Sequence, residues 1–222
     1  MNSDTQTPTL SLIRTPTINP ARALVASTLL LCAGIAQAEL SANVGWVSDY
    51  YYRGLLQHSS SASAGIDYSE GGFYAGAWGA DVGDGMEIDG YFGWGGEYEG
   101  FTFGADFTGY YYTGDFDDTY QEINLSLGYG FASAEFATGE YENFAGPTQD
   151  YTYYAFTLEK DGLYGKYAGF SRDFDGDYLE FGYGFAVESL DLSIALIVAD
   201  DPVTSDTEEA LVFGIGKSFQ IN

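Results

Sequence analysis

Cysteine is almost absent from this chain, which has Cys32 as its single example. A chain with one cysteine cannot close an internal disulfide, so its fold must rest on burial and on backbone hydrogen bonding. Long apolar runs are missing too. The run over 23–35 is shorter than the ~20 residues that a membrane-spanning helix needs, and no later run approaches that length. The sequence therefore excludes a disulfide scaffold and predicts no helical anchor after residue 38.

Basic side chains are scarce as well. The chain has 7 Lys and Arg against 33 Asp and Glu, which gives a formal net charge of -26. Proteins bind nucleic acids by neutralising phosphates with Lys and Arg, so we expect no nucleic-acid partner. Histidine is limited to His58, and the sequence lacks Cys and His clusters, a phosphate-binding glycine motif and a cofactor signature. We therefore expect no metal site and no cofactor.

The first residues have the order of a secretory signal peptide. A polar lead with two arginines precedes the apolar run over 23–35, and small residues follow at Ala36 and Ala38, the two positions that a signal peptidase reads. This order predicts a signal peptide over 1–38, which is removed, and a single mature domain over 39–222.

The rest of the chain alternates apolar and polar residues with a period of two. In the segment 122–129, one parity carries Ile123, Leu125, Leu127 and Tyr129, while the other carries polar or small residues. A period of two puts the two sets on opposite faces of a strand and fits no helix. The pattern is typical of an all-β fold, a transmembrane antiparallel up-and-down β-barrel with an apolar outer face.

Twelve such segments follow residue 38, and bacterial single-chain barrels have even strand numbers. They are 40–52, 61–68, 73–80, 87–98, 101–111, 120–129, 131–140, 151–159, 163–171, 178–187, 190–198 and 210–219. A secreted soluble β protein rich in Gly and Tyr is the alternative, although it would have to bury twelve apolar faces against one another. Tyrosines crowd the strand ends, as at 50–52 and 110–112, and we assign them to the membrane interface because amphipathic rings favour it.

The connections between these segments are predicted to alternate in length, which places all the short turns at one rim. The long ones are 53–60, 81–86, 112–119, 141–150, 172–177 and 199–209. Since the chain enters from the periplasm and its first connection is long, we expect the long loops outside the cell and both termini in the periplasm. The protein would then lie in the outer membrane, in contact with its lipid and lipopolysaccharide, and would be folded by the barrel-assembly machinery.

One segment of the first strand is distinctive. Ser48–Gly54, with the sequence SDYYYRG, resembles the signature that opens the TorF-family porins of proteobacteria. The stretches 72–78 (GFYAGAW) and 87–91 (EIDGY) are similar to the same family, and the similarity runs over essentially the whole mature chain. The resemblance implies an outer-membrane barrel of about this size. The chain departs from many barrels at its end, where Phe219 is followed by three further residues.

Parity predicts which charged residues face the lumen. In the first strand the even positions from Leu40 to Trp46 are apolar, so the odd positions, among them Asp49 and Arg53, should point inward. The same rule gives the lumen carboxylates Asp67, Glu87, Asp89, Glu97, Asp106, Glu122, Glu135, Glu159, Glu180 and Asp191. It adds the cations Lys166 and Arg172, so the predicted interior is acidic with a few embedded cations.

Two interpretations of this interior stay open. In the first, the carboxylates line a water-filled path and favour cations, which predicts a porin-like channel for small solutes, mainly cationic ones and ions. In the second, they form hydrogen-bonded ion pairs with Arg53, Lys166 and tyrosine hydroxyls that plug a closed structural or surface-interaction barrel.

An enzyme is disfavoured. Outer-membrane lipid hydrolases use His and Ser, and His58 is followed by Ser59 and Ser60, but these residues fall in a predicted outer loop without a recognisable oxyanion hole. We assign no catalytic residue.

Overall fold

The computed structural model describes residues 38–200 and 207–221, and the predicted signal peptide lies outside these residues except for Ala38. Twelve strands follow one another without a helix in this part of the chain. They are β1 Glu39–Tyr52, β2 Leu55–Glu70, β3 Phe73–Gly83, β4 Gly85–Tyr98, β5 Phe101–Tyr112, β6 Tyr120–Tyr129, β7 Ala132–Tyr141, β8 Gln149–Lys160, β9 Leu163–Arg172, β10 Asp177–Val187, β11 Leu190–Asp200 and β12 Thr207–Ile221. No helix long and apolar enough to span a membrane occurs within the described residues.

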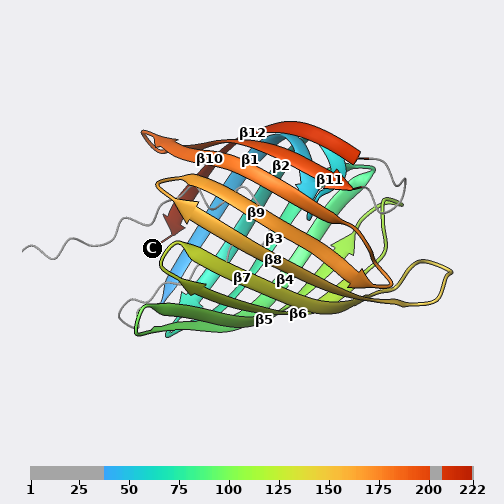
Figure 1. The fold of residues 1–222 in the computed structure, drawn as a ribbon, viewed down its shortest axis with the longest axis horizontal. Helices are drawn as coiled ribbons and strands as arrows, with labels where there is room; N and C mark the ends of the chain where they lie inside the picture. Colours follow the sequence, from blue (N-terminus) through green and yellow to red (C-terminus); the bar gives the residue numbers. More distant parts are fainter. Residues whose placement is uncertain (1–37, 201–206, 222) are drawn as a thin grey trace, which may run out of the picture.

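The strands form one closed antiparallel barrel, as predicted (Figure 1). Each strand pairs with its neighbour in sequence, and β1 pairs with β12 from Leu40↔Ile221 to Val47↔Gly214 to close the ring. A closed ring has no free edge, so its backbone N–H and C=O groups are paired without disulfides. The first and last strands meet with their free ends at the same rim.

The two rims of the barrel differ in their connections. One rim, here called the turn rim, has two-residue turns at 71–72, 99–100, 130–131, 161–162 and 188–189, and the C-terminus lies at this end (Figure 1). The other, here called the loop rim, carries the longer connections 113–119, 142–148 and 173–176. The predicted loop over 199–209 falls partly on residues 201–206, which lie outside the described residues.

Two predicted long loops are wrong. The segment 53–60 is a turn at Arg53 and Gly54 followed by β2, because both turn residues adopt positive φ angles, 49° and 86°. Two successive positive φ angles give a tight hairpin that matches the twist of the strands. The segment 81–86 is likewise strand around a turn at Asp84, flanked by Gly83 and Gly85 at φ 84° and 117°. The first connection is therefore short, so the orientation cannot be derived from its length.

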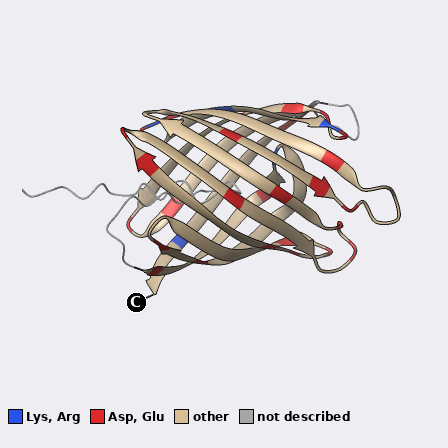
Figure 2. Cartoon of the chain, turned by 90° about the horizontal axis from the view of Figure 1, so that it is seen from below, with Lys and Arg blue, Asp and Glu red and all other residues tan. Residues whose placement is uncertain are grey.

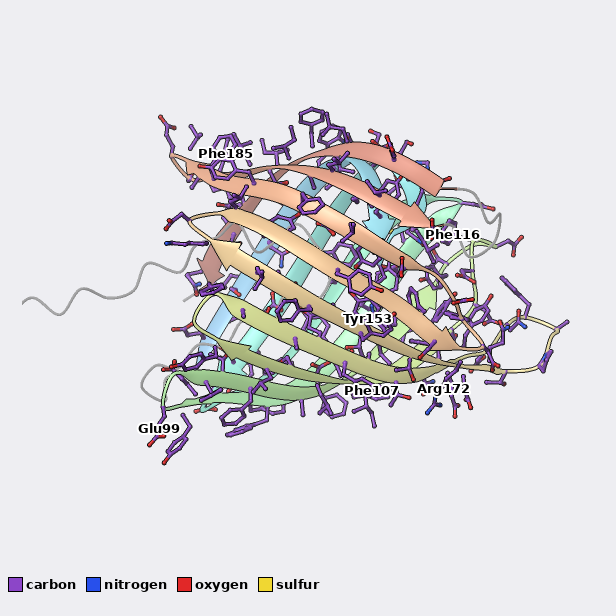
Figure 3. All side chains as sticks on the ribbon, viewed as in Figure 1. Glu99, Phe107, Phe116, Tyr153, Arg172 and Phe185 are labelled. Carbon is purple, nitrogen blue, oxygen red and sulfur yellow. The ribbon has the colours of Figure 1, made fainter. Side chains whose placement is uncertain are left out.

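The outer surface of the barrel is apolar over all its strands. In β6, Ile123, Leu125 and Leu127 are each at least half exposed, while Asn124 between them hydrogen-bonds inside the barrel, which confirms the predicted parity. Figure 3 shows Phe107 and Phe185 projecting away from the wall. An exposed apolar surface of this extent is characteristic of a protein that contacts lipid. The soluble alternative would have covered these side chains.

Glycines make room for rings inside the barrel. A Cβ at Gly76 would lie 2.5 Å from the Tyr91 hydroxyl oxygen, and one at Gly182 would lie 2.4 Å from the Tyr164 ring. Only glycine allows such close approach without displacing the neighbour. These positions let two tyrosines lie across the sheet, and their hydroxyls donate to the lumen carboxylates Asp67 and Glu180.

Candidate functional site

An ion pair crosses the lumen near the loop rim. The Arg53 guanidinium, at the β1–β2 turn, donates two hydrogen bonds to the Glu122 carboxylate in β6, with N···O distances of 2.7 and 2.8 Å. The two side chains are 6% and 0% exposed. Because β1 and β6 are five strands apart around a ring of twelve, this pair spans the barrel rather than following its wall.

Tyrosines complete the environment of the ion pair. Tyr110 and Tyr151 donate to Glu122 at 2.6 and 2.9 Å, so its carboxylate accepts four hydrogen bonds. The rings of Tyr52 and Tyr153 stack on the guanidinium, whose central carbon lies 5.0 and 4.1 Å from their centroids. Burial alone would lower the pKa of Arg53, but the Glu122 carboxylate raises it, and the pKa lies well above its ordinary value. The charge is therefore permanent.

A second carboxylate lies beside this pair. Glu87 in β4 is 1% exposed and accepts hydrogen bonds from Tyr50 at 2.5 Å and from Tyr112 at 2.9 Å. Asp89, two residues further along β4, is 7% exposed, but its Oδ1 atom has no hydrogen-bond partner.

We call this group of side chains the tyrosine belt. It comprises Tyr50, Tyr52, Arg53, Glu87, Asp89, Tyr110, Tyr112, Glu122, Tyr151, Tyr153 and Tyr178. It joins strands from several sides of the barrel, and Tyr151, Glu87 and Glu122 are among the most deeply buried large side chains of the described residues. The belt therefore obstructs the lumen in its half near the loop rim.

The lumen near the turn rim is arranged differently. Its polar residues are half-buried, and we call this region the vestibule: Asn43, Asp67, Tyr74, Tyr91, Asp106, Asn124 and Glu135. The hydrogen bonds among them join adjacent or next-adjacent strands along the wall. Asp67 accepts from Asn43 at 3.3 Å and from Tyr91, and Asp106 accepts from Tyr74 at 3.0 Å and from Asn124 at 2.9 Å. Figure 2 shows how far Asp and Glu outnumber Lys and Arg along the chain.

Lys166 and Glu180 form a third group between β9 and β10. The Lys166 ammonium lies 3.7 Å from the Glu180 carboxylate, which also accepts a hydrogen bond from Tyr164. The Lys166 and Glu180 side chains are 11% and 4% exposed and lie on the turn-rim side of the belt. Of the expected lumen residues, this pair and the Arg53–Glu122 pair are therefore neutralised in place.

Two charged residues are placed differently from the prediction. Asp49 accepts a hydrogen bond from the exposed Ser59 and does not join the lumen network. The reason is a change of parity in β1. Val47 and Tyr50 are three residues apart, yet both pack in one buried cluster, so the alternation of inward and outward residues is interrupted between them. Arg172 lies at the loop rim (Figure 3). Its side chain is 53% exposed, and its guanidinium lies 3.9 Å from the Asp150 carboxylate.

The prediction that the two strand-end triplets lie at the membrane interface is wrong for four of their six tyrosines. Tyr50, Tyr52, Tyr110 and Tyr112 lie inside the barrel, whereas Tyr111 is 46% exposed on its outer face. Composition alone indicated a membrane interface. Parity could have found the belt, since alternate members of a triplet must face opposite sides of the sheet.

His58 lies in β2 rather than in a loop, opposite Tyr50. Its neighbours are engaged elsewhere, because Ser59 donates to Asp49 at 2.8 Å and Ser60 accepts from the Trp46 indole at 3.2 Å. Among the described residues, no three His, Cys, Asp or Glu side chains are grouped as a metal site would require.

The fold resembles solved membrane proteins, but no curated protein matches the sequence. A structure from a study of the mechanism of in-meso crystallization of membrane proteins has a TM-score of 0.55 at 12% identity, with 82% of this chain and 84% of that chain covered. This likeness shows the fold.

Two larger proteins are less similar. The outer membrane protein OpdK of Pseudomonas aeruginosa has a TM-score of 0.43 at 14% identity, with 82% of this chain and 61% of that chain covered. OccAB3 of Acinetobacter baumannii has a TM-score of 0.42 at 12% identity, with coverages of 85% and 66%. This chain thus spans less than two thirds of the length of each.

The sequence itself matches one family. The resemblance of Ser48–Gly54 to the TorF-family porins stays a prediction. A sequence model described as a bacterial protein of unknown function, Gcw_chp, matches residues 33–210, and the chain belongs to this family.

Proposed function

We propose that this protein is a porin-like channel of the outer membrane for small cationic solutes. The observation that supports the proposal most is the vestibule, where the half-buried carboxylates Asp67 and Asp106 line the interior of a closed ring with an apolar outer wall. Low-dielectric walls focus the field of such charges and raise the local concentration of cations.

The tyrosine belt would be the narrowest part of the path. A solute that crosses it must pass the Arg53–Glu122 pair and the rings stacked on it. We therefore expect a small conductance that rises when the belt is opened.

A closed structural barrel is the second candidate, and the belt itself favours it. Glu87, Glu122 and Tyr151 are at most 2% exposed, and every oxygen of the two glutamates accepts a hydrogen bond. Buried carboxylates whose oxygens are all hydrogen-bonded rigidify a barrel interior.

The remaining expectations concern the surroundings of the barrel. We propose that its apolar wall contacts outer-membrane lipid and lipopolysaccharide, that the loop rim faces outward and both termini face the periplasm, and that the barrel-assembly machinery inserts it. We propose no enzyme activity.

Conductance in planar bilayers tests the channel. The purified, heat-modifiable barrel should conduct, and its reversal potential in a salt gradient should show cation preference. Replacing Asp67 and Asp106 together by Asn should reduce the preference. The matched control Asp115→Asn removes an exposed loop carboxylate, whose field is screened beyond ~8 Å at physiological ionic strength, and should have little effect. A folded barrel that never conducts would support the closed structural alternative, and anion preference would contradict the proposed selectivity.

A further inference from the structure

Asp89 differs from the other carboxylates of the tyrosine belt in its hydrogen bonding. Glu122 is held by Arg53 and two tyrosines, and Glu87 is held by Tyr50 and Tyr112. Asp89 is only 7% exposed, and its buried Oδ1 atom has no hydrogen-bond partner. A buried carboxylate oxygen without a donor is costly, so it is the belt carboxylate oxygen that a cation would stabilise most.

The charges around Asp89 do not supply a counterion. Glu87 and Glu122 both interact electrostatically with Asp89, and both are acidic. Arg53 is the cation of the belt, and both of its terminal nitrogens already donate to Glu122. Three carboxylates therefore share one cation, and Asp89 is the one with an oxygen that accepts no hydrogen bond.

Asp89 lies at the end of the belt that faces the vestibule. Along β4 the inward-facing residues run from Glu87 near the loop rim through Asp89 to Tyr91, whose hydroxyl belongs to the vestibule. Asp89 is thus the last belt carboxylate before the half-exposed region. Its cross-strand neighbours are Trp78 in β3 and Tyr110 in β5.

We propose that the Asp89 carboxylate binds monovalent cations that enter the lumen from the vestibule, and that this contact sets the cation preference of the barrel. The second part rests on the proposed channel function, whereas the binding does not. We assign a monovalent ion because Asp89 offers a single free carboxylate oxygen, whereas Ca²⁺ takes about six to eight oxygen ligands. Carboxylate oxygen and water are suitable ligands for a hard cation that must also leave.

Trp78 provides a direct test of binding. In a variant with Trp46→Phe and Trp94→Phe, Trp78 is the remaining tryptophan, and it lies opposite Asp89. Cs⁺ quenches tryptophan fluorescence on contact, so titration with CsCl at constant ionic strength in detergent should give saturable quenching. K⁺ should compete with it in the protein with Asp89 intact.

The variant Asp89→Asn should weaken Cs⁺ quenching about tenfold, which corresponds to about 1.4 kcal/mol. The matched control Asp115→Asn removes an exposed loop carboxylate outside the lumen, and it should leave saturable quenching in place. Acrylamide, a neutral quencher, should act equally on all three proteins. Linear Cs⁺ quenching that K⁺ does not reduce, or quenching unchanged by Asp89→Asn, would overturn the proposal.

Bilayer recordings separate this proposal from the channel itself. If the unmodified barrel conducts with cation preference and Asp89→Asn abolishes that preference, both hold. If the preference survives Asp89→Asn, the selectivity role of Asp89 is wrong while the channel stands. Saturable Cs⁺ binding in a barrel that never conducts would retain the site and refute the channel.

Discussion

The two halves of the lumen use the same kinds of residue in different geometries. In the belt, Arg53 reaches Glu122 five strands away, and the rings of Tyr52 and Tyr153 close around it. In the vestibule, Asp67 and Asp106 bond only to strands next to their own or one further. Contacts across the ring cross the lumen, whereas contacts along the wall do not cross it. Carboxylates and tyrosines thus fill the lumen where their hydrogen bonds join opposite sides of the ring, and they line its wall where the bonds join neighbouring strands.

The largest expected difference between the halves comes from Glu122→Ala. It leaves the buried Arg53 guanidinium without its carboxylate, which costs about 3–5 kcal/mol. Asp106→Ala removes an acceptor whose donors are neutral, and its cost should be about 1 kcal/mol. Urea unfolding in detergent, followed by heat-modifiability on gels, measures both.

A double variant separates the charge from the packing. Arg53→Met together with Glu122→Leu removes both charges, and such replacements are often neutral for stability. We expect this barrel to fold and to conduct better than the unmodified one. Equal losses from Glu122→Ala and Asp106→Ala would show that the belt is no more strongly held than the vestibule.

The next largest effect concerns the wall that both halves share. Leu125→Arg puts a charge on the outer face and should impair assembly by about 2–4 kcal/mol if the position is near the bilayer midplane. Ser126→Arg, one residue on, puts it in the lumen and should be milder. Yields of folded protein in lipid vesicles compare the two, and equal tolerance would contradict the assignment of the faces.

Single hydroxyls give a smaller contrast. Tyr112→Phe takes one of two tyrosine donors from the buried Glu87, which should cost about 1.5–3 kcal/mol because the acceptor is charged. Tyr74→Phe takes one of three donors from Asp106 and should cost less than about 1 kcal/mol. The same unfolding measurement applies. A larger loss of stability from Tyr74→Phe than from Tyr112→Phe would show that the vestibule is held more strongly than the belt.

The smallest effect is expected at Asp49. Its partner is the exposed Ser59, outside the lumen network, so Asp49→Asn should change stability by no more than about 0.5 kcal/mol. It should also leave the reversal potential unchanged. A loss of cation preference in this variant would contradict the placement of Asp49 outside the lumen.

Most of the barrel could be predicted from the sequence because alternation is a local signal. The strand 120–129 was predicted with its observed bounds, and the apolar parity of Ile123 and Leu125 is confirmed. The turn at Arg53 and Gly54 was missed, because a polar stretch with serines reads as a loop until its pairing with β1 is known.

The candidate site was harder to predict than the strands. Parity identified Asp67, Asp89, Asp106, Glu122 and Glu135 as inward-facing, but it could not tell which partners they meet across the ring. It also failed at Asp49, where the alternation of β1 is interrupted. Partners across a barrel depend on its closure and tilt, which no single strand encodes.

The separation of Arg53 and Glu122 along the chain has a consequence for folding. These residues are 69 positions apart, and their hydrogen bonds require β1 and β6 to face each other. Early hairpins form from neighbouring residues, whereas this pair can form only after the first six strands have curled into half of a ring. We expect its burial to mark a late step of folding, at which a barrel of the wrong curvature or strand register would leave a charge without its partner.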